Sequence, residues 1–104
     1  MPVLSMLRMR GDPDELWAKL EEHVEPVADR LAPRHGGVLN IVGRAADGLV
    51  IVNLWEHEQG RHDIAAEPEM QAAFAASGLP QPDFEGFEVV RVRVDERLRE
   101  HSVR

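Results

Sequence analysis

The stretch VLNIVGRAADGLVIVNLWE, residues 38–56, has the pattern of two strands joined by a tight turn. Its flanks are rich in Val, Ile and Leu, which favour strands, and Asp47–Gly48 separates them. An Asp-Gly pair is a strong hairpin signal, because the central positions of the turn need backbone conformations that these residues adopt readily. We therefore predict a hairpin of two strands, residues 38–45 and residues 49–56.

A helix is predicted before this hairpin. In the run GDPDELW, Asp12 can cap the first turn and Pro13 suits the first helical position. Apolar residues then recur at helical spacing as far as Leu31. Pro26 should bend this helix, and Pro33 with the glycines after it should end it.

Further elements are expected on both sides. Residues 3–10 alternate between apolar and polar side chains, as do residues 87–94, and this period of two predicts a strand in each. After the hairpin we expect a short helix and then a second helix that starts near Pro68 and ends at Gly78. A proline-rich connector over residues 79–86 follows.

The resulting order is strand, helix, strand, strand, helix, strand. It predicts the split βαβ arrangement of ferredoxin-like α+β domains, in which a four-stranded antiparallel sheet carries both helices on one face. We expect one such domain over residues 1–94 and a polar tail over residues 95–104. A chain of 104 residues buries only about two thirds of its unfolded surface, so a homodimer is the expected assembly.

Composition excludes several classes of function. The chain has 12 basic and 19 acidic residues, a net charge of −7, which repels phosphate backbones and anionic lipids. We therefore expect no nucleic-acid partner and no membrane partner. The absence of cysteine excludes disulfides, thiolate nucleophiles and zinc–thiolate sites. No apolar run has the length of a signal-peptide core or a membrane span, which predicts a soluble cytoplasmic protein.

The two faces of the predicted sheet differ in polarity. To the helix side we assign the more uniformly apolar sets, which are Leu39 and Ile41, then Val50, Val52 and Leu54, then Val90, Val92 and Val94. The opposite face then holds Met6, Arg8, Arg10, Val38, Asn40, Val42, Arg44, Leu49, Ile51, Asn53, Trp55, Phe87, Val89, Arg91 and Arg93. Such a face is too apolar for solvent and too polar for a dry interface. We expect a second subunit to cover it and to enclose a small-molecule chamber.

With this strand order, with Trp55 at the end of the third strand and with the run WEHEQGRHDIAAEP, the sequence resembles the dimeric α+β barrel proteins. It is most similar to their antibiotic biosynthesis monooxygenase-like branch, and the resemblance covers residues 3–94. That superfamily includes cofactor-free oxygenases of polyketide aromatics, haem-degrading enzymes, quinol oxygenases, isomerases, lyases and members without a known substrate.

The resemblance implies a cofactor-independent monooxygenase-like enzyme that acts on a small aromatic or enolisable metabolite. In the oxygenases of this family a strand Asn, a Trp and a basic residue bind a phenolic substrate and stabilise its deprotonated form. Asn53, Trp55 and Arg91 look like that set, although this chain has no tyrosine and its Asn lies two residues before the Trp. The chemistry needs fixed donors aimed at an oxyanion in a site that excludes bulk water.

On this resemblance the candidate catalytic residues are Asn53 and Arg91 as oxyanion donors, Trp55 as a stacking surface and His62 as the base. The predicted substrate-binding residues are Met6, Arg8, Asn40, Val42, Arg44 and Val89. No cofactor is implied. We also expect no metal site, because His57 and His62 are five residues apart and do not share a helical face.

Two other functions stay open. The chamber can be a non-catalytic binding site or a plain dimer seam, in which Trp55 is an interface residue and the strand arginines pair with acidic side chains. An isomerase or cyclase on the same scaffold differs from an oxygenase only in the fate of the enolate.

Overall fold

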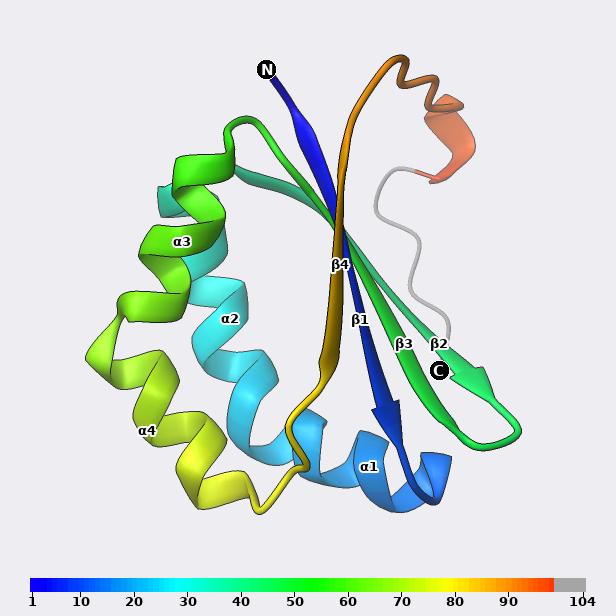
Figure 1. Ribbon diagram of the computed structural model, residues 1–104, viewed down its shortest axis with the longest axis vertical. Coiled ribbons are helices and arrows are strands. Elements are labelled where there is room, and N and C mark those ends of the chain that lie inside the picture. Colours follow the sequence, from blue (N-terminus) through cyan, green and yellow to red (C-terminus); the bar gives the residue numbers. More distant parts are fainter. Residues whose placement is uncertain (99–104) are drawn as a thin grey trace.

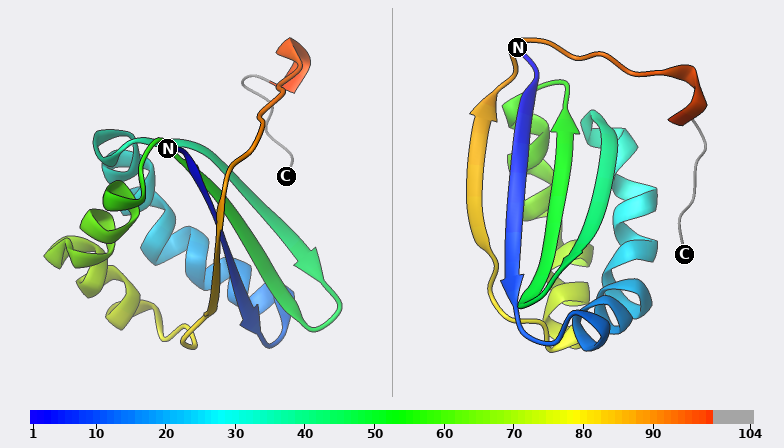
Figure 2. Two further views of the ribbon diagram at one scale, coloured as in Figure 1. Left: turned by 45° about the horizontal axis from the view of Figure 1, so that its top comes forward. Right: turned by 90° about the vertical axis from the view of Figure 1, so that its right-hand side faces the viewer.

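Helices cover one face of a four-stranded antiparallel sheet in the computed structural model, which describes residues 1–98 (Figure 1). The strands are β1 Val3–Arg10, β2 Gly37–Ala45, β3 Gly48–Trp55 and β4 Asp83–Glu88. They lie in the order β2-β3-β1-β4, so β2 and β4 form the edges of the sheet (Figure 2). The predicted ferredoxin-like α+β topology is confirmed, and the predicted hairpin strands agree with β2 and β3 to within one residue.

The helical layer has two parts. The first part is one continuous helical segment made of α1 Pro13–Lys19, the π-helical turn η1 Leu20–Val24, α2 Glu25–Leu31 and the 3-10 turn η2 Ala32–His35. The second part follows β3 and consists of α3 Glu58–Ala66 and α4 Pro68–Ser77. Both parts pack on the same face of the sheet (Figure 1).

Pro26 disturbs the first helical segment, as its position predicts. Proline has no N–H to donate and lies here in the first turn of α2. The turn before it is π-helical, and the Glu25 N–H donates to the carbonyl of Leu20, five residues earlier. As a result α1 and α2 run in different directions (Figure 1).

The start of α1 depends on a side-chain cap. Asp12 has extended backbone angles, and its Oδ2 accepts a hydrogen bond from the Glu15 N–H at 2.9 Å. We expect Asp12→Ala to lower the free energy of unfolding by about 1 kcal/mol, because that N–H loses its partner. Urea denaturation measures the change. Asp29→Ala, at an exposed position on α2, is the control and should change stability by about 0.5 kcal/mol or less; equal losses would contradict the capping role.

The core lies between the helices and the sheet. Met9 of β1, Leu20 of η1 and Leu49 of β3 are each 1% exposed. Because side chains two apart on a strand share a face, the other core residues of β3, Ile51 and Trp55, point to the helices together with Leu49.

This arrangement contradicts the predicted orientation of the second and third strands. Asn53 lies opposite Ser5 of β1 and Asn40 of β2, on the face that the helices cover. Val52 lies opposite Met6 and Ile41, on the other face. The residues wrongly assigned to the helix side are Leu39, Ile41, Val50, Val52 and Leu54. The more uniformly apolar set faces away from the helices, because the helix side has to accommodate polar groups around a cavity.

The uncovered face of the sheet, which we call the outer face, is strongly apolar. Leu39, Ile41 and Phe87 are exposed there by 41%, 53% and 41%. The cross-strand pairs place Leu4, Met6, Val50, Val52 and Leu54 on the same face. Met6 and Arg8 do lie on this outer face, as predicted for the first strand.

The last strand lies earlier in the chain than predicted. β4 covers Asp83–Glu88, whereas alternation predicts residues 87–94. The strand begins directly after Pro82, inside the expected connector. It ends where its neighbour ends, because Glu88 pairs with Val3, the first residue of β1. Beyond it the Val89 N–H donates to the Pro2 carbonyl, at 3.0 Å. Alternation continues to Val94, but within residues 1–98 no strand of the sheet pairs with this part of the chain.

The predicted polar tail begins with a 3-10 turn, η3 Glu96–Leu98, and residues 99–104 lie outside the described residues. Asp95 accepts a 2.8 Å hydrogen bond from Arg97 Nε, and this contact holds the pKa of the Asp95 carboxyl below its ordinary value. Among residues 1–98, no helix has both the length and the apolar composition needed to cross a bilayer.

Candidate functional site

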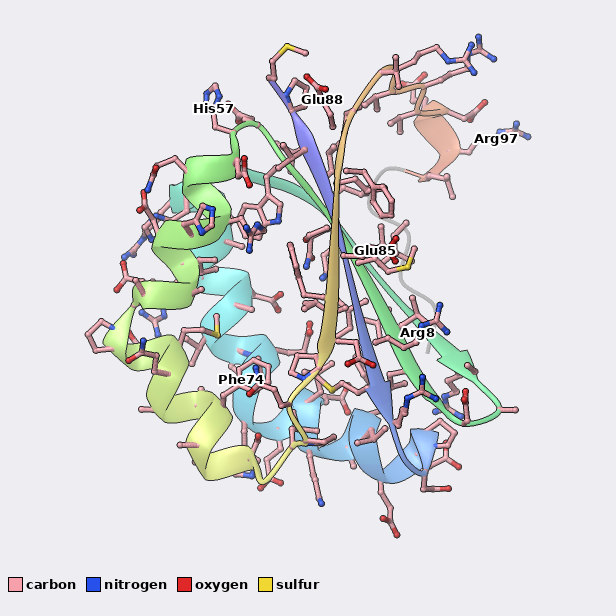
Figure 3. All side chains as sticks on the ribbon, viewed as in Figure 1. Arg8, His57, Phe74, Glu85, Glu88 and Arg97 are labelled. Atoms are coloured by element: carbon pink, nitrogen blue, oxygen red, sulfur yellow. The ribbon has the colours of Figure 1, made fainter. Side chains whose placement is uncertain are left out.

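A cavity of about 530 Å³ lies between the sheet and the helices of a single chain. Its floor comes from all four strands, and its roof comes from η1 and α2 on one side and from α3 and α4 on the other. The apolar part of its wall is formed by Leu20, Val24, Ile51, Ile64, Met70 and Phe74. Phe74 points from α4 towards the sheet (Figure 3). The volume falls within the range of about 300–1,000 Å³ that is typical of small-molecule sites.

Two amide side chains on the floor form a pair. Asn40 Nδ2 donates to Asn53 Oδ1 at 2.6 Å across β2 and β3, and both residues line the cavity. Each amide has an NH2 group and a carbonyl oxygen. The pair therefore leaves the Asn53 NH2 group and the Asn40 carbonyl oxygen available to a bound molecule. A donor and an acceptor side by side suit a ligand hydroxyl, and the donor alone suits an oxyanion.

Trp55 also lines the cavity. Its indole Nε1 donates to Ser5 Oγ at 3.2 Å, and these two residues are 5% and 1% exposed. The hydrogen bond uses the polar group of the indole and fixes the orientation of the ring. Trp55 therefore offers a bound molecule an apolar surface rather than a hydrogen bond.

Arg61 of α3 is a cationic residue at the border of the cavity. It is not among the site residues predicted from the sequence. Its side chain is 21% exposed, and the guanidinium carbon lies 4.2 Å from the centre of the Phe84 ring of β4. Its Nη2 is 3.7 Å from Glu58 Oε1 and 3.1 Å from His62 Nε2. The sequence does contain a signal for Arg61. It lies three residues before the core residue Ile64 and therefore borders the buried face of its helix.

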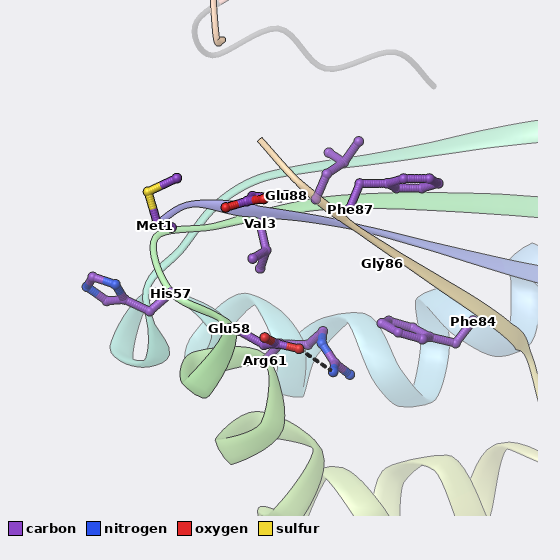
Figure 4. A pocket seen from close by; sticks show the side chains of 10 residues that line it. Met1, Val3, His57, Glu58, Arg61, Phe84, Gly86, Phe87 and Glu88 are labelled. Carbon is purple, nitrogen blue, oxygen red and sulfur yellow. Dashed lines mark ion pairs between the residues drawn. The ribbon is translucent and has the colours of Figure 1, made fainter. Parts of the chain in front are cut away.

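A second hollow of about 650 Å³ lies next to the cavity, where β1 begins and β4 ends (Figure 4). Its lining includes Met1, His57, Glu58 and Glu88. Arg61 and Phe84 line both spaces, so this stacked pair stands between them. The positive charge is therefore next to the cavity and also within reach of solvent ions.

The position of α3, and with it Arg61, depends on a close helix contact. Gly60 is buried, and a Cβ atom at this position would lie 1.8 Å from the carbonyl oxygen of His35 in η2. A hydrogen-bonded pair 3.0 Å apart, His35 Nε2 and Glu67 Oε1, joins the same two regions. Only glycine lets α3 come this near to η2.

The structure brings together three of the predicted site residues: Asn40, Asn53 and Trp55 all line the cavity. Val42 pairs with Ile51 and packs against the core from the same face. The cavity is closed by the helices of the same chain rather than by a second sheet, so the predicted chamber on the outer face is wrong in its location.

The other predicted site residues do not line this cavity. Met6 and Arg8 lie on the outer face, and Arg8 points away from the helices (Figure 3). Arg44 Nη1 is 2.7 Å from Asp14 Oδ1, an exposed ion pair. His62 is exposed, with Nε2 3.6 Å from Glu58 Oε1. Val89 and Arg91 follow β4 and lie outside the sheet of their own chain. Alternation along a strand shows which side chains share a face. It does not show which of the two faces the helices cover, so it could not separate residues that line the cavity from residues that do not.

The described residues contain no group of three or more His, Asp or Glu side chains arranged to hold a metal ion.

Comparison with known proteins gives likenesses in structure. No protein-family model and no curated protein sequence matches the chain. A candidate antibiotic biosynthesis monooxygenase from Deinococcus radiodurans is 17% identical with a TM-score of 0.67, and the match covers 89% of this chain and 97% of that one. SnoaB, a cofactor-independent oxygenase from Streptomyces nogalater, is 16% identical with a TM-score of 0.61, over 88% and 93% of the two chains.

A dimeric ferredoxin-like protein of unknown function from Jannaschia sp. CCS1 is 14% identical with a TM-score of 0.65, over 86% of this chain and all of the other. At these identities the likeness concerns the fold. The chain shares the ferredoxin-like α+β fold of these proteins.

Proposed function

We propose that this protein is a cofactor-independent monooxygenase that acts, as a cytoplasmic homodimer, on a small aromatic or enolisable metabolite. The observation that carries the proposal is the cavity between sheet and helices, with an apolar wall, the Asn40–Asn53 amide pair on its floor and Arg61 at its border. A fold shared with a cofactor-independent oxygenase supports the same chemistry.

The cavity residues suit an anionic aromatic intermediate. A flat ring fits against the indole of Trp55, and the free NH2 group of Asn53 can donate to the oxygen of a phenolate or enolate. Donors held in place before the reaction stabilise such an anion strongly where bulk water is excluded. Arg61 adds a positive charge from the helix side and takes the part that the sequence assigns to Arg91. Together these groups lower the pKa of the bound hydroxyl by favouring its ionised form.

The overall reaction balances without an external reductant. The ionised substrate passes electrons to dioxygen, a carbon–oxygen bond forms at the activated ring carbon, and the oxygen–oxygen bond then breaks. The activated methylene carbon keeps one oxygen atom and becomes a carbonyl. The second oxygen atom leaves as water with the two hydrogens of that carbon, so one methylene group and one dioxygen give one carbonyl group and one water. The substrate supplies all four electrons that dioxygen accepts.

The proposed homodimer rests on the apolar character of the outer face of the sheet. Leu39, Ile41 and Phe87 are exposed side by side with partly buried apolar residues of β1 and β3. A large exposed apolar patch of this kind is typical of an interaction surface. Two such faces, one from each subunit, can cover each other, and at least one protein of the same fold is described as dimeric.

The test is oxygen consumption with a panel of polyphenols whose ring system contains an activated methylene group. We expect saturable oxygen uptake, one O2 per substrate, unchanged by EDTA and without hydrogen peroxide as product. Substrate alone and heat-denatured protein are the controls for autoxidation. Binding without oxygen uptake would overturn the oxygenase and support a binding protein, while product formation without oxygen uptake would support an isomerase or cyclase.

A further inference from the structure

Within residues 1–98, Arg61 is the only arginine or lysine that lines the cavity or the hollow. Its side chain is largely buried, in a chain whose net charge is −7. A charged group taken out of water is costly unless an opposite charge or several hydrogen bonds compensate it. The contacts of the guanidinium therefore indicate whether it is already compensated or is open to an anionic ligand.

The contacts inside the chain compensate Arg61 only in part. Glu58 Oε1 is 3.7 Å from Nη2, beyond hydrogen-bond distance, and the Glu58 side chain is 65% exposed. Nη2 donates to His62 Nε2, and the Phe84 ring covers one face of the guanidinium (Figure 4). Within residues 1–98, Nε and Nη1 donate to no acceptor. No buried side-chain nitrogen in this part of the chain lacks a partner, so these two atoms border open space.

Charges in the cavity lining are separated between the two sides of the roof. Glu25 and Asp29 belong to α2, whereas Arg61 lies on α3 and contacts β4 through Phe84. An anionic group in the cavity is repelled on the α2 side and attracted on the α3 side. This separation sets the direction in which an anionic ligand binds, with its charged end at Arg61.

The distance between Arg61 and the amide pair suits the two ends of one molecule. Asn53 lies on β3 and Phe84 lies on β4, with β1 between these strands. Two strand spacings correspond to about 10 Å. A fused aromatic ring system with a hydroxyl at one end and a carboxylate at the other has a comparable length. Its hydroxyl can meet the amide pair while its carboxylate meets Arg61.

We propose that the ligand of the cavity is a hydroxyaryl carboxylate, and that its carboxylate replaces Glu58 as the ionic partner of Arg61. Arginine presents its donors in a planar fork that matches a carboxylate. The inference deepens the function proposed above by naming the substrate class, and it rests on that proposal for the aromatic ring. Arg61 still favours ionisation of the hydroxyl, because an unpaired carboxylate in the same ligand would oppose a second negative charge.

Calorimetric titration with two matched probes tests this subsite. The probes are a hydroxynaphthoate, with its hydroxyl and carboxylate on opposite rings, and the carboxamide of the same molecule. They differ in charge but hardly in shape, and neither has an activated methylene group. At about pH 7 the hydroxyl of both is protonated, so the carboxylate is the one anionic group. We expect the carboxylate to bind about tenfold more tightly than the carboxamide. Equal affinities, or no binding of the carboxylate, would overturn the proposal.

Arg61→Gln should remove this preference by lowering the affinity for the carboxylate to that for the carboxamide. The affinity for the carboxamide should stay within about threefold of the parent value, which shows that the cavity is intact. Arg44→Gln is the matched control, because it removes an equal charge from an exposed ion pair outside the cavity. A preference that survives Arg61→Gln, or that Arg44→Gln abolishes equally, would overturn the proposal.

Glu58→Gln should have the opposite effect. It removes the acid that competes for Arg61, so the carboxylate should bind about threefold more tightly. Weaker binding by this variant would overturn the proposed exchange of partners.

These titrations measure binding without turnover. A charge preference without oxygen uptake by the polyphenol panel would overturn the proposed oxygenase and leave the carboxylate subsite standing. Oxygen uptake without a charge preference would overturn the subsite alone.

Discussion

Replacement of Asn53 by alanine should lower the rate constant for oxygen consumption about 100- to 1,000-fold, the usual cost of removing one oxyanion donor. The Asn53 amide accepts from Asn40 through its oxygen, and Asn53 lines the cavity. In the proposed reaction its NH2 group donates to the substrate anion, and alanine removes that donor. Stopped-flow oxygen uptake under substrate saturation measures the effect. Thermal unfolding of the variant shows whether the fold is retained.

Asn40→Ala is the matched control, since it removes an amide from the same pair. Asn40 orients Asn53 and offers an acceptor, not a donor, so its loss should cost about tenfold, within the range for an indirect hydrogen bond. The proposed role of Asn53 would be wrong if its alanine variant kept a rate within about threefold of the parent protein. It would also be wrong if the two variants lost activity equally.

Gly60→Ala should be among the most destabilising single substitutions in the chain, with a loss of about 2–3 kcal/mol. The added methyl group would lie 1.8 Å from the His35 carbonyl oxygen, far inside van der Waals contact, and that atom belongs to backbone that cannot rotate away. The helix α3 must then move off η2 and carry Arg61 with it. Urea denaturation measures the stability change, and a titration with an active polyphenol of the panel measures the change in affinity.

Gly43→Ala provides the control, because a Cβ atom at Gly43 on β2 would meet nothing within 4 Å. This edge-strand substitution should change stability by about 0.5 kcal/mol or less. If Gly60→Ala were as mild as Gly43→Ala, α3 would not be held against η2 in the way the structure indicates.

Local signals in the sequence predicted most of the fold. Asp47–Gly48 marks the hairpin, Asp12 and Pro13 mark the start of α1, and Gly78 ends α4. Each of these signals acts through the backbone of a few neighbouring residues, so a single sequence contains them fully. The last strand was the exception. Alternation continues through Val94, but the end of β4 depends on where β1 begins, and the two strands are about eighty residues apart.

The candidate site was predicted in part. Asn40, Asn53 and Trp55 stand out in the sequence because polar and aromatic residues in the middle of apolar strands need a physical reason. Their predicted location is wrong. We assigned the more uniformly apolar face of the sheet to the helices, whereas in the structure that face points away from the helices. A face that packs against a second subunit can be more uniformly apolar than a face that surrounds a cavity. Arg61 was missed since a charged residue on a short helix normally lies in solvent.

The sequence by itself determined the order of strands and helices and, for the first three strands, their approximate bounds and the set of side chains that share each face. Only the tertiary structure decided which face the helices cover, where β4 ends and that Arg61 rather than Arg91 borders the cavity within one chain. The physical reason is the period of two in a strand: one step of register inverts every side chain. That step is settled by contacts between β1 and β3, such as Ser5 with Asn53, which no local pattern contains.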